Sequence, residues 1–119
     1  VRGLHFQKEC PQGKLVRCIK GTIIDVAVDI RPNSPTFGKH VSAILSEDNK
    51  NQLWVPRGFA HGYASLGEEN IVLYKCDDFY HPEDEGGIKW DDPALGIDWN
   101  VTNPIVSDKD QILPLLSEM

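Results

Sequence analysis

The four histidines of this chain are the side chains best suited to acid–base chemistry near neutral pH, and their surroundings differ. His40 and His81 stand among polar residues without suggestive neighbours, which favours surface positions for both. His5 lies in a strand-like run in which it shares a face with Gln7, and His61 ends a turn and enters another strand-like run. Taken alone, His5 and His61 are each as compatible with a structural role as with a functional one.

Metal binding is the first chemistry to test for these histidines. Many small barrels of the cupin type hold a metal with a His-x-His pair, a carboxylate and a later histidine in a Pro-x-Gly-x-x-His turn. The later element is present at Pro56, Gly58 and His61. The first is absent, because the only candidate reads His5-Phe6-Gln7 and no His-x-His occurs in the chain. The sequence therefore predicts neither a metal site nor a cofactor.

The composition indicates one small acidic domain, since 119 residues with 40% apolar and 25% charged side chains leave no room for a second. The net charge of −6 argues against nucleic acid as a partner, but local Arg and Lys side chains can still bind a small anion. Cys10, Cys18 and Cys76 are odd in number and lack CxxC spacing, which argues against disulfides and zinc. No apolar run reaches the length of a membrane span and no signal peptide is recognisable, so we expect a cytoplasmic protein without a membrane partner.

Short strands dominate the predicted secondary structure. Gly and Pro punctuate the chain at short intervals, and the segments between them are rich in Val, Ile, Tyr and Trp. Such a pattern predicts an all-β, antiparallel sandwich or barrel whose cavity suits a small ligand. A helical turn is predicted only in the tail, where Ser107 caps a segment from Asp108 towards Leu116 that is broken at Pro114. The expected strands are residues 2–7, 14–20, 23–30, 40–45, 52–55, 61–66 and 71–78.

Alternation along two of these strands decides which side chains share a face. One face of the third strand is entirely aliphatic and the other carries Asp25 and Asp29, so this second face lies either in solvent or on the wall of a polar cavity. In the opening strand, strict alternation puts Arg2 and His5 on opposite faces. If both residues serve one site, a bulge at Gly3 or a partner chain must bring them together.

Ten short runs, collinear and spread over nearly the whole chain, carry a resemblance to a known family. They are Val1-Arg2-Gly3-Leu4-His5-Phe6-Gln7, Gln12-Gly13-Lys14-Leu15-Val16-Arg17, Asp25-Val26-Ala27-Val28-Asp29, Ser34-Pro35-Thr36-Phe37-Gly38, Gln52-Leu53-Trp54-Val55-Pro56, Gly58-Phe59-Ala60-His61-Gly62, Leu73-Tyr74-Lys75, Trp90-Asp91-Asp92-Pro93, Gly96-Ile97-Asp98-Trp99 and Ser107-Asp108-Lys109-Asp110. With these runs the chain resembles the dTDP-4-dehydrorhamnose 3,5-epimerases.

The resemblance implies a fold, a reaction and partners. The implied fold is a metal-free, cofactor-free antiparallel jelly roll of the cupin-like kind, usually assembled as a homodimer. The implied substrate is a dTDP-sugar, dTDP-4-keto-6-deoxy-D-glucose, which is inverted at C3 and C5 to dTDP-4-keto-L-rhamnose in dTDP-L-rhamnose biosynthesis. Epimerising a carbon beside a ketone removes a proton from one face and returns one to the other, so the site needs a base, an acid and a group that stabilises the enolate.

The resemblance also implies a role for each matching residue. His5 is similar to the proton acceptor of the family, Asp110 to the carboxylate that orients it, and Tyr74 to the proton donor on the opposite sugar face. Lys14 matches a position that contacts the substrate, and we expect it to stabilise the enolate oxygen. The other predicted substrate-binding residues are Arg2, His61, Glu85, Lys109 and Tyr80, of which the last matches a tyrosine that stacks on thymine.

Two other function classes stay open at this point. A relative from another deoxysugar pathway would epimerise only one carbon, and a non-catalytic sugar-binding barrel would use the same cavity without turnover. The family ordinarily carries a substantial segment before the Arg-Gly-Leu-His run, which helps to bind the nucleotide and takes part in the dimer. We expect residues 1–119 to form a single barrel domain without that segment and to bind the substrate more weakly.

Overall fold

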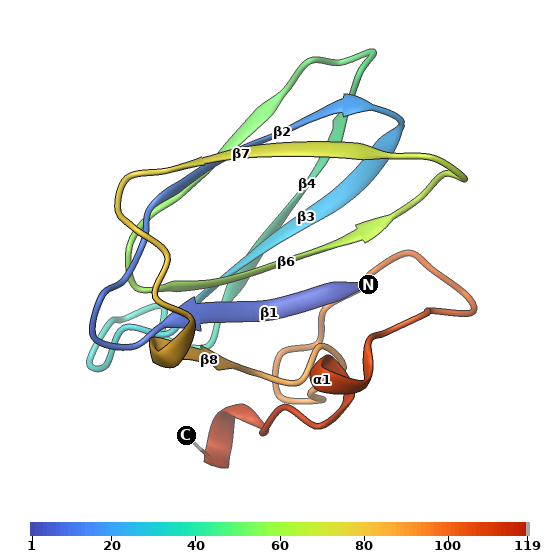
Figure 1. The fold of residues 1–119 in the computed structure, drawn as a ribbon. Helices are drawn as coiled ribbons and strands as arrows, with labels where there is room; N and C mark the ends of the chain where they lie inside the picture. The colour runs from blue at the N-terminus through green and yellow to red at the C-terminus, as the bar shows by residue number, and fades with distance from the viewer. Residues whose placement is uncertain (119) are drawn as a thin grey trace.

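The computed structural model describes residues 1–118, whose regular secondary structure consists mainly of strands in two antiparallel sheets (Figure 1). The larger sheet has the strand order β4-β3-β6-β1-β8, and the smaller has the order β5-β2-β7. The strands are β1 (Arg2–Gln7), β2 (Lys14–Lys20), β3 (Thr22–Asp29), β4 (His40–Ser46), β5 (Gln52–Val55), β6 (Phe59–Ser65), β7 (Ile71–Cys76) and β8 (Glu85–Gly87). The predicted all-β, jelly-roll-like class is confirmed.

Every strand predicted from the sequence is present, and the ends differ by no more than two residues. The strands β2 and β5 have the predicted ends. Two short elements were not predicted, the 3-10 turn η1 (Pro82–Asp84) and the strand β8 that follows it. The reason is local, because a three-residue strand containing two glycines is too short to show the alternation on which strand prediction depends.

The predicted helical turn in the tail is shorter than expected. Ser107 caps the helix α1 (Asp108–Gln111) by accepting a hydrogen bond from the Asp110 amide at 3.2 Å. The helix ends at Gln111, before the break that was predicted at Pro114, since Pro114 has no N–H and disfavours helical geometry in the residue before it. A second 3-10 turn, η2 (Leu116–Glu118), follows the proline. None of the helices within residues 1–118 has the length and apolar character of a membrane span.

The strand β1 contains a bulge at Gly3, which was one of the two predicted ways to bring Arg2 and His5 together. Its pairing with β6 shifts register between Arg2 and His5, around Gly3 with a φ of 119°. A Cβ on Gly3 would lie 2.7 Å from the Cα of Gly62, so only glycine allows β1 and β6 to approach this closely. Because of this bulge Arg2 and His5 line the same cavity within one chain.

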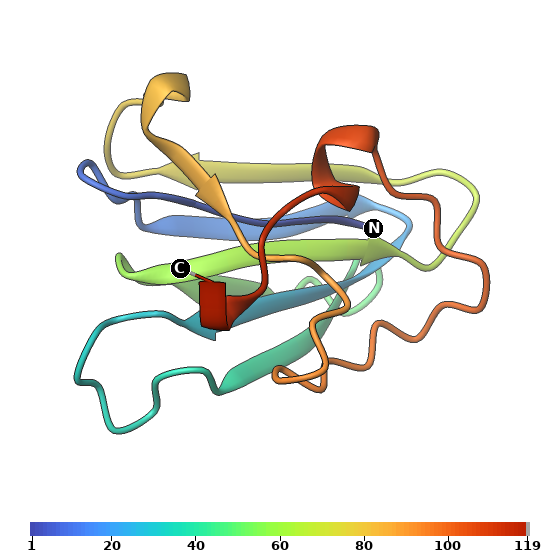
Figure 2. The same ribbon diagram turned by 90° about the horizontal axis from the view of Figure 1, so that it is seen from below.

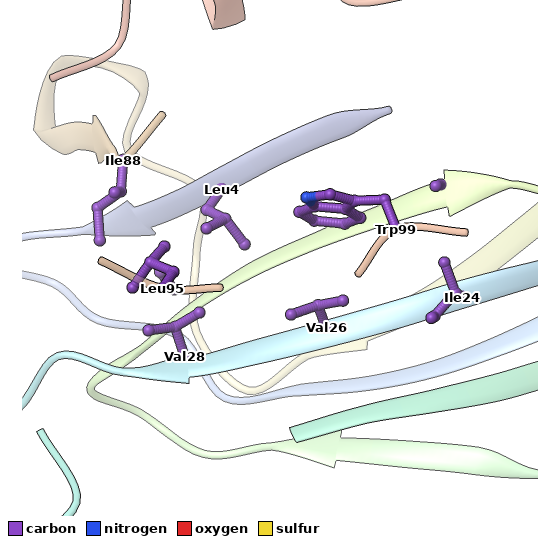
Figure 3. Close-up of a cluster of buried hydrophobic side chains, with 9 residues drawn as sticks. Leu4, Ile24, Val26, Val28, Ile88, Leu95 and Trp99 are labelled. Carbon is purple, nitrogen blue, oxygen red and sulfur yellow. The ribbon is translucent and has the colours of Figure 1, made fainter. Parts of the chain in front are cut away.

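The aliphatic face of β3 packs on the outer side of the larger sheet, under the segment that follows β8. That segment crosses the sheet in Figure 2, and its apolar side chains point at the sheet in Figure 3. The Trp99 indole also donates a hydrogen bond to the carbonyl of Trp90 at 2.8 Å, which fixes the ring in the core. The buried residues of this cluster are Leu4, Ile24, Val26, Val28, Ala60, Ala64, Ile88, Leu95 and Trp99.

The other face of β3 packs between the two sheets. Its apolar residues join the second core cluster, which contains Val16, Cys18, Ile23, Ala27, Leu45 and Val55. Asp25 and Asp29 lie on this face and are fully buried. The Asp29 carboxylate accepts hydrogen bonds from Arg31, Ser34 and Thr36 of the following loop. Asp25 is instead hydrogen-bonded to His61, in the site described next. The face with two acids is therefore buried, and it does not face solvent.

Candidate active site

A cavity of about 320 Å³ opens between the two sheets and is lined by side chains from both. Its size is in the range of cavities that accept small organic ligands. Of the nine predicted site residues, seven line it directly: Arg2, His5, Lys14, His61, Tyr74, Tyr80 and Glu85. The other two, Lys109 and Asp110, contact Glu85 and His5 from the helix α1.

His5 and Asp110 form a hydrogen-bonded pair at the edge of this cavity. The His5 Nε2 and the Asp110 Oδ1 are 2.6 Å apart, and the Asp110 Oδ2 accepts a hydrogen bond from the Gly3 amide at 3.1 Å. Burial alone would raise the pKa of Asp110, but the hydrogen bonds from His5 and Gly3 outweigh it and hold the pKa below its usual value. An ionised Asp110 selects the tautomer with the proton on Nε2, and the lone pair then lies on Nδ1.

A second histidine–aspartate pair lies deeper in the same cavity. The His61 Nε2 is 2.6 Å from the Asp25 Oδ1, and the two side chains are only 7% and 0% exposed. His61 stands directly opposite His5 in the pairing of β6 with β1, so both rings project into the cavity. The Asp25 Oδ2 is buried and has no hydrogen-bond partner among residues 1–118.

Lys14 and Tyr74 line the cavity from the smaller sheet. They lie on the adjacent strands β2 and β7, and the Lys14 Nζ is 5.7 Å from the centre of the Tyr74 ring. Burial lowers the pKa of Lys14, and the positive charge of Arg2 lowers it further. The cavity therefore has two imidazoles on the wall of the larger sheet and a cation with a phenol on the wall of the smaller one.

Glu85 connects the remaining predicted residues at the mouth of the cavity. Its Oε1 is 3.1 Å from the Lys109 Nζ and 3.8 Å from the His5 Nδ1, and its Oε2 accepts a hydrogen bond from the Tyr80 hydroxyl at 2.9 Å. Burial alone would raise the pKa of Glu85, but the hydrogen bonds from Lys109 and Tyr80 hold it below its usual value. The hydrogen bond to Glu85 raises the pKa of the Tyr80 phenol. All nine predicted residues thus belong to one contiguous site.

His40 and His81 do not line the cavity, and both are only partly buried. The nearest carboxylate to His81 is that of Glu83, at 3.3 Å and exposed. Within the described chain no three His, Cys, Asp or Glu side chains are grouped as metal ligands. His5 and His61 are each hydrogen-bonded through Nε2 to one carboxylate, and His5 has the Glu85 carboxylate as a second, more distant neighbour.

Comparison with known proteins assigns the family. The family model described as dTDP-4-dehydrorhamnose 3,5-epimerase matches residues 1–118. The chain belongs to this family. A dTDP-4-dehydrorhamnose 3,5-epimerase from Methanothermobacter thermautotrophicus is 54% identical over 114 residues, which are 93% of this chain and 62% of the relative.

Solved structures of the epimerase family share the fold at high similarity. The dTDP-4-dehydrorhamnose 3,5-epimerase of Elizabethkingia anophelis superposes with a TM-score of 0.96 at 50% identity, over 98% of this chain and 66% of that one. The epimerase of Legionella pneumophila in complex with dTDP-4-keto-L-rhamnose gives a TM-score of 0.95 at 50% identity, over 98% and 62%. The chain therefore spans slightly less than two thirds of the length of these family members.

Two residues at this site, Asp25 and Gln7, were not predicted from the sequence. The signal for Asp25 was its place on a strand face that could form the wall of a polar cavity. The signal for Gln7 was the face that it shares with His5. Neither pattern identifies the hydrogen-bond partner of the side chain, because that partner depends on the pairing of strands and loops that are distant in sequence.

Proposed function

We propose that the chain epimerises dTDP-4-keto-6-deoxy-D-glucose at C3 and C5 to give dTDP-4-keto-L-rhamnose. One observation carries the proposal: His5 and Tyr74 belong to different sheets and line the same cavity. A sugar ring between the sheets then has the base on one face and the acid on the other, which is what inversion at carbon requires. Membership of the epimerase family supports the same reaction.

The first step is the removal of a proton from the carbon beside the C4 ketone. The His5 Nδ1 takes this proton, and the electrons of the C–H bond pass to the ketone oxygen, which becomes an enolate oxygen. Asp110 stabilises the imidazolium that forms, through the 2.6 Å hydrogen bond to Nε2. The Lys14 ammonium donates a hydrogen bond to the enolate oxygen and stabilises the developing negative charge.

The second step returns a proton to the same carbon from the opposite face. The Tyr74 hydroxyl donates this proton, the ketone forms again and the configuration is inverted. The phenolate then recovers its proton from water, and the imidazolium loses its own. C3 and C5 both flank the C4 ketone, so the same groups serve both carbons in turn.

His61 has a binding role in this mechanism. Its Nε2 is held by the buried Asp25, so the ring is fixed and its Nδ1 is directed to a hydroxyl group of the sugar. The nucleotide is bound at the mouth, where Arg2 and Lys109 supply positive charge for the diphosphate. Tyr80 provides an aromatic face for the thymine ring.

The assembly and the location of the protein are part of the same proposal. We propose a homodimer, because a domain of this size gains stability from burying further surface. The exposed apolar side chains of the smaller sheet, which include Trp54, Ile71 and Leu73, support such an association. We also propose that residues 1–119 form one barrel domain and act in the cytoplasm.

A single incubation tests the reaction. The chain is mixed with dTDP-4-keto-6-deoxy-D-glucose in D₂O, and exchange of the C3 and C5 hydrogens is followed by NMR. Exchange and inversion at both carbons are expected, without any effect of a chelator. Exchange at one carbon would replace the proposal with a single-carbon epimerase, and binding without exchange would replace it with a sugar-binding barrel.

A further inference from the structure

The segment between β7 and η1 carries Tyr80 to the mouth of the cavity. In Figure 1 this segment descends from β7 past the end of β1 before it enters η1 and β8. The Tyr80 side chain is 63% exposed, and its hydroxyl is bonded to Glu85. A ring that exposed keeps a defined position only if the backbone that carries it is held.

Acidic side chains hold both ends of the segment through hydrogen bonds to backbone amides. At the first end, the Asp77 Oδ1 accepts a hydrogen bond from the Gly13 amide at 2.8 Å. At the far end, the Asp84 carboxylate accepts hydrogen bonds from the amides of Glu9 and Cys10 at 2.9 and 2.8 Å. The pKa of Asp77 is lowered first by its hydrogen bond from Arg57 and then by that from Gly13, and the pKa of Asp84 by the bonds from Cys10 and Glu9. None of these bonds reaches the backbone next to Tyr80.

Gln7 holds the backbone on both sides of Tyr80. Its Oε1 accepts a hydrogen bond from the His81 amide at 2.8 Å, and its Nε2 lies 3.4 Å from the carbonyl oxygen of Phe79 and 2.6 Å from that of Cys10. Within residues 1–118 no other side chain is hydrogen-bonded to both neighbours of Tyr80. Gln7 is only 7% exposed, so each of these bonds is shielded from competition with water.

The chemistry of the contact explains why a glutamine stands there. Binding the Phe79 carbonyl and the His81 amide at once needs a donor and an acceptor on one rigid group, and the carboxamide of Gln or Asn carries both. Gln7 is also paired with Glu85 across β1 and β8, and Glu85 accepts the hydrogen bond from the Tyr80 hydroxyl. The same strand pair therefore fixes Tyr80 at its backbone and at the tip of its ring.

We propose that Gln7 is a positioning residue that sets the Tyr80 ring for stacking on the base of the nucleotide. This inference rests on the proposed function, in which Tyr80 contacts thymine. Gln7 performs no proton transfer, so its loss changes nucleotide binding and leaves the proton chemistry at His5 in place. Replacement of Gln7 should therefore raise the KM and leave the kcat unchanged.

The test replaces Gln7 with methionine, which has a similar shape but no hydrogen-bonding amide. We expect dTDP affinity, measured by calorimetry, to fall on the order of tenfold, and the KM for dTDP-4-keto-6-deoxy-D-glucose to rise in parallel. The kcat should stay within about twofold of the wild-type value. Gln111→Met is the matched control, because Gln111 also donates a hydrogen bond to a backbone carbonyl, that of Val106, and does not line the cavity. It should weaken dTDP binding less than about threefold.

A double-mutant cycle separates positioning from direct contact with the ligand. In a Tyr80→Ala background, Gln7→Met should change dTDP affinity by less than about twofold. An undiminished effect in that background overturns the inference, as does a fall in kcat at unchanged KM. If the wild-type chain binds no dTDP, the proposed function fails and this inference fails with it. If wild type binds dTDP and Gln7→Met binds it equally well, only the inference fails.

Hydrogen exchange provides a test that needs no variant. Because its acceptor is the buried Gln7 side chain, the His81 amide of the wild-type chain should exchange with D₂O much more slowly than an open loop amide. A fast-exchanging His81 amide overturns the inference even if Gln7→Met does not fold.

Discussion

Two histidine–aspartate pairs face the same cavity with the same 2.6 Å separation, yet they are built differently. His5 and Asp110 are 105 residues apart in sequence, and the one-turn helix α1, outside the sheet, carries the aspartate to β1. His61 and Asp25 lie on the neighbouring strands β6 and β3 within the sheet. The first histidine side chain is 18% exposed, whereas the second is 7% exposed.

The difference in construction indicates a difference in use. The second oxygen of Asp110 accepts a hydrogen bond from the Gly3 amide, so this carboxylate is held in place, as the proposed proton transfer at His5 requires. The His5 ring also lies beside Glu85 at the cavity mouth, where an extra positive charge is tolerated. Asp25 is buried in the sheet, and within residues 1–118 its Oδ2 has no hydrogen-bond partner, so the His61 bond is its one side-chain hydrogen bond and the pair is fixed in orientation by burial.

The largest expected effect separates the two histidines. His5→Asn should lower kcat by about 10²–10⁴-fold, because it removes the base. His61→Asn should act mainly on KM, with a rise on the order of tenfold, because it removes a contact to the sugar. Steady-state kinetics of the two variants make the comparison, and equal losses of kcat would show that both pairs take part in proton transfer.

Lys14, on the wall opposite both pairs, gives the next largest effect. Lys14→Ala should lower kcat by about 10²–10³-fold, the usual loss when one donor to a developing oxyanion is removed. The measurement is steady-state kinetics at saturating substrate. A Lys14→Ala variant with near-native turnover would remove this residue from the enolate contact.

The two aspartates should differ less than the two histidines. Asp110→Asn should lower kcat by at least about tenfold, because an amide does not stabilise the imidazolium that forms at His5 and can select the wrong tautomer. Asp25→Asn keeps an oxygen that accepts from His61, so its kcat should fall less than about tenfold. Kinetics and thermal unfolding of both variants test this, and the reverse order of kcat losses would contradict the distinction between the pairs.

The smallest expected effect is a shift of the pH profile. Burial lowers the pKa of Lys14, so its charge is lost as the pH rises through that lowered pKa. The alkaline fall of kcat/KM should therefore begin at a lower pH than for an ordinary lysine. Lys14→Arg keeps its charge and should move this fall to higher pH. An alkaline limb at the same pH in both proteins would exclude Lys14 as its origin.

The fold could be predicted from local patterns wherever those patterns are long enough. Alternation over four or more residues identified the strands from β1 to β7, and the Ser107 cap identified the start of α1. The strand β8 was missed because three residues with two glycines carry no alternation. The helix α1 was predicted too long because the effect of Pro114 begins at the residue before it.

The candidate site was harder to predict because its contacts are long-range. No local pattern links His5 to Asp110, and the resemblance to the epimerase family was needed to pair them. The partner of Asp25 depends on register, since His61 stands opposite Ala27, two residues along β3. The bulge at Gly3 could be anticipated, because alternation put Arg2 and His5 on opposite faces of one strand.

In the proposed mechanism His5 removes the proton and Tyr74 returns it from the other sheet. Its most direct test is deuterium exchange into recovered substrate, measured by NMR in D₂O for His5→Asn and Tyr74→Phe. Tyr74→Phe should exchange the hydrogens beside the ketone without forming inverted product, because the base is intact. His5→Asn should show neither exchange nor inversion. Exchange by His5→Asn at a rate near that of wild type would show that His5 is not the group that removes the proton.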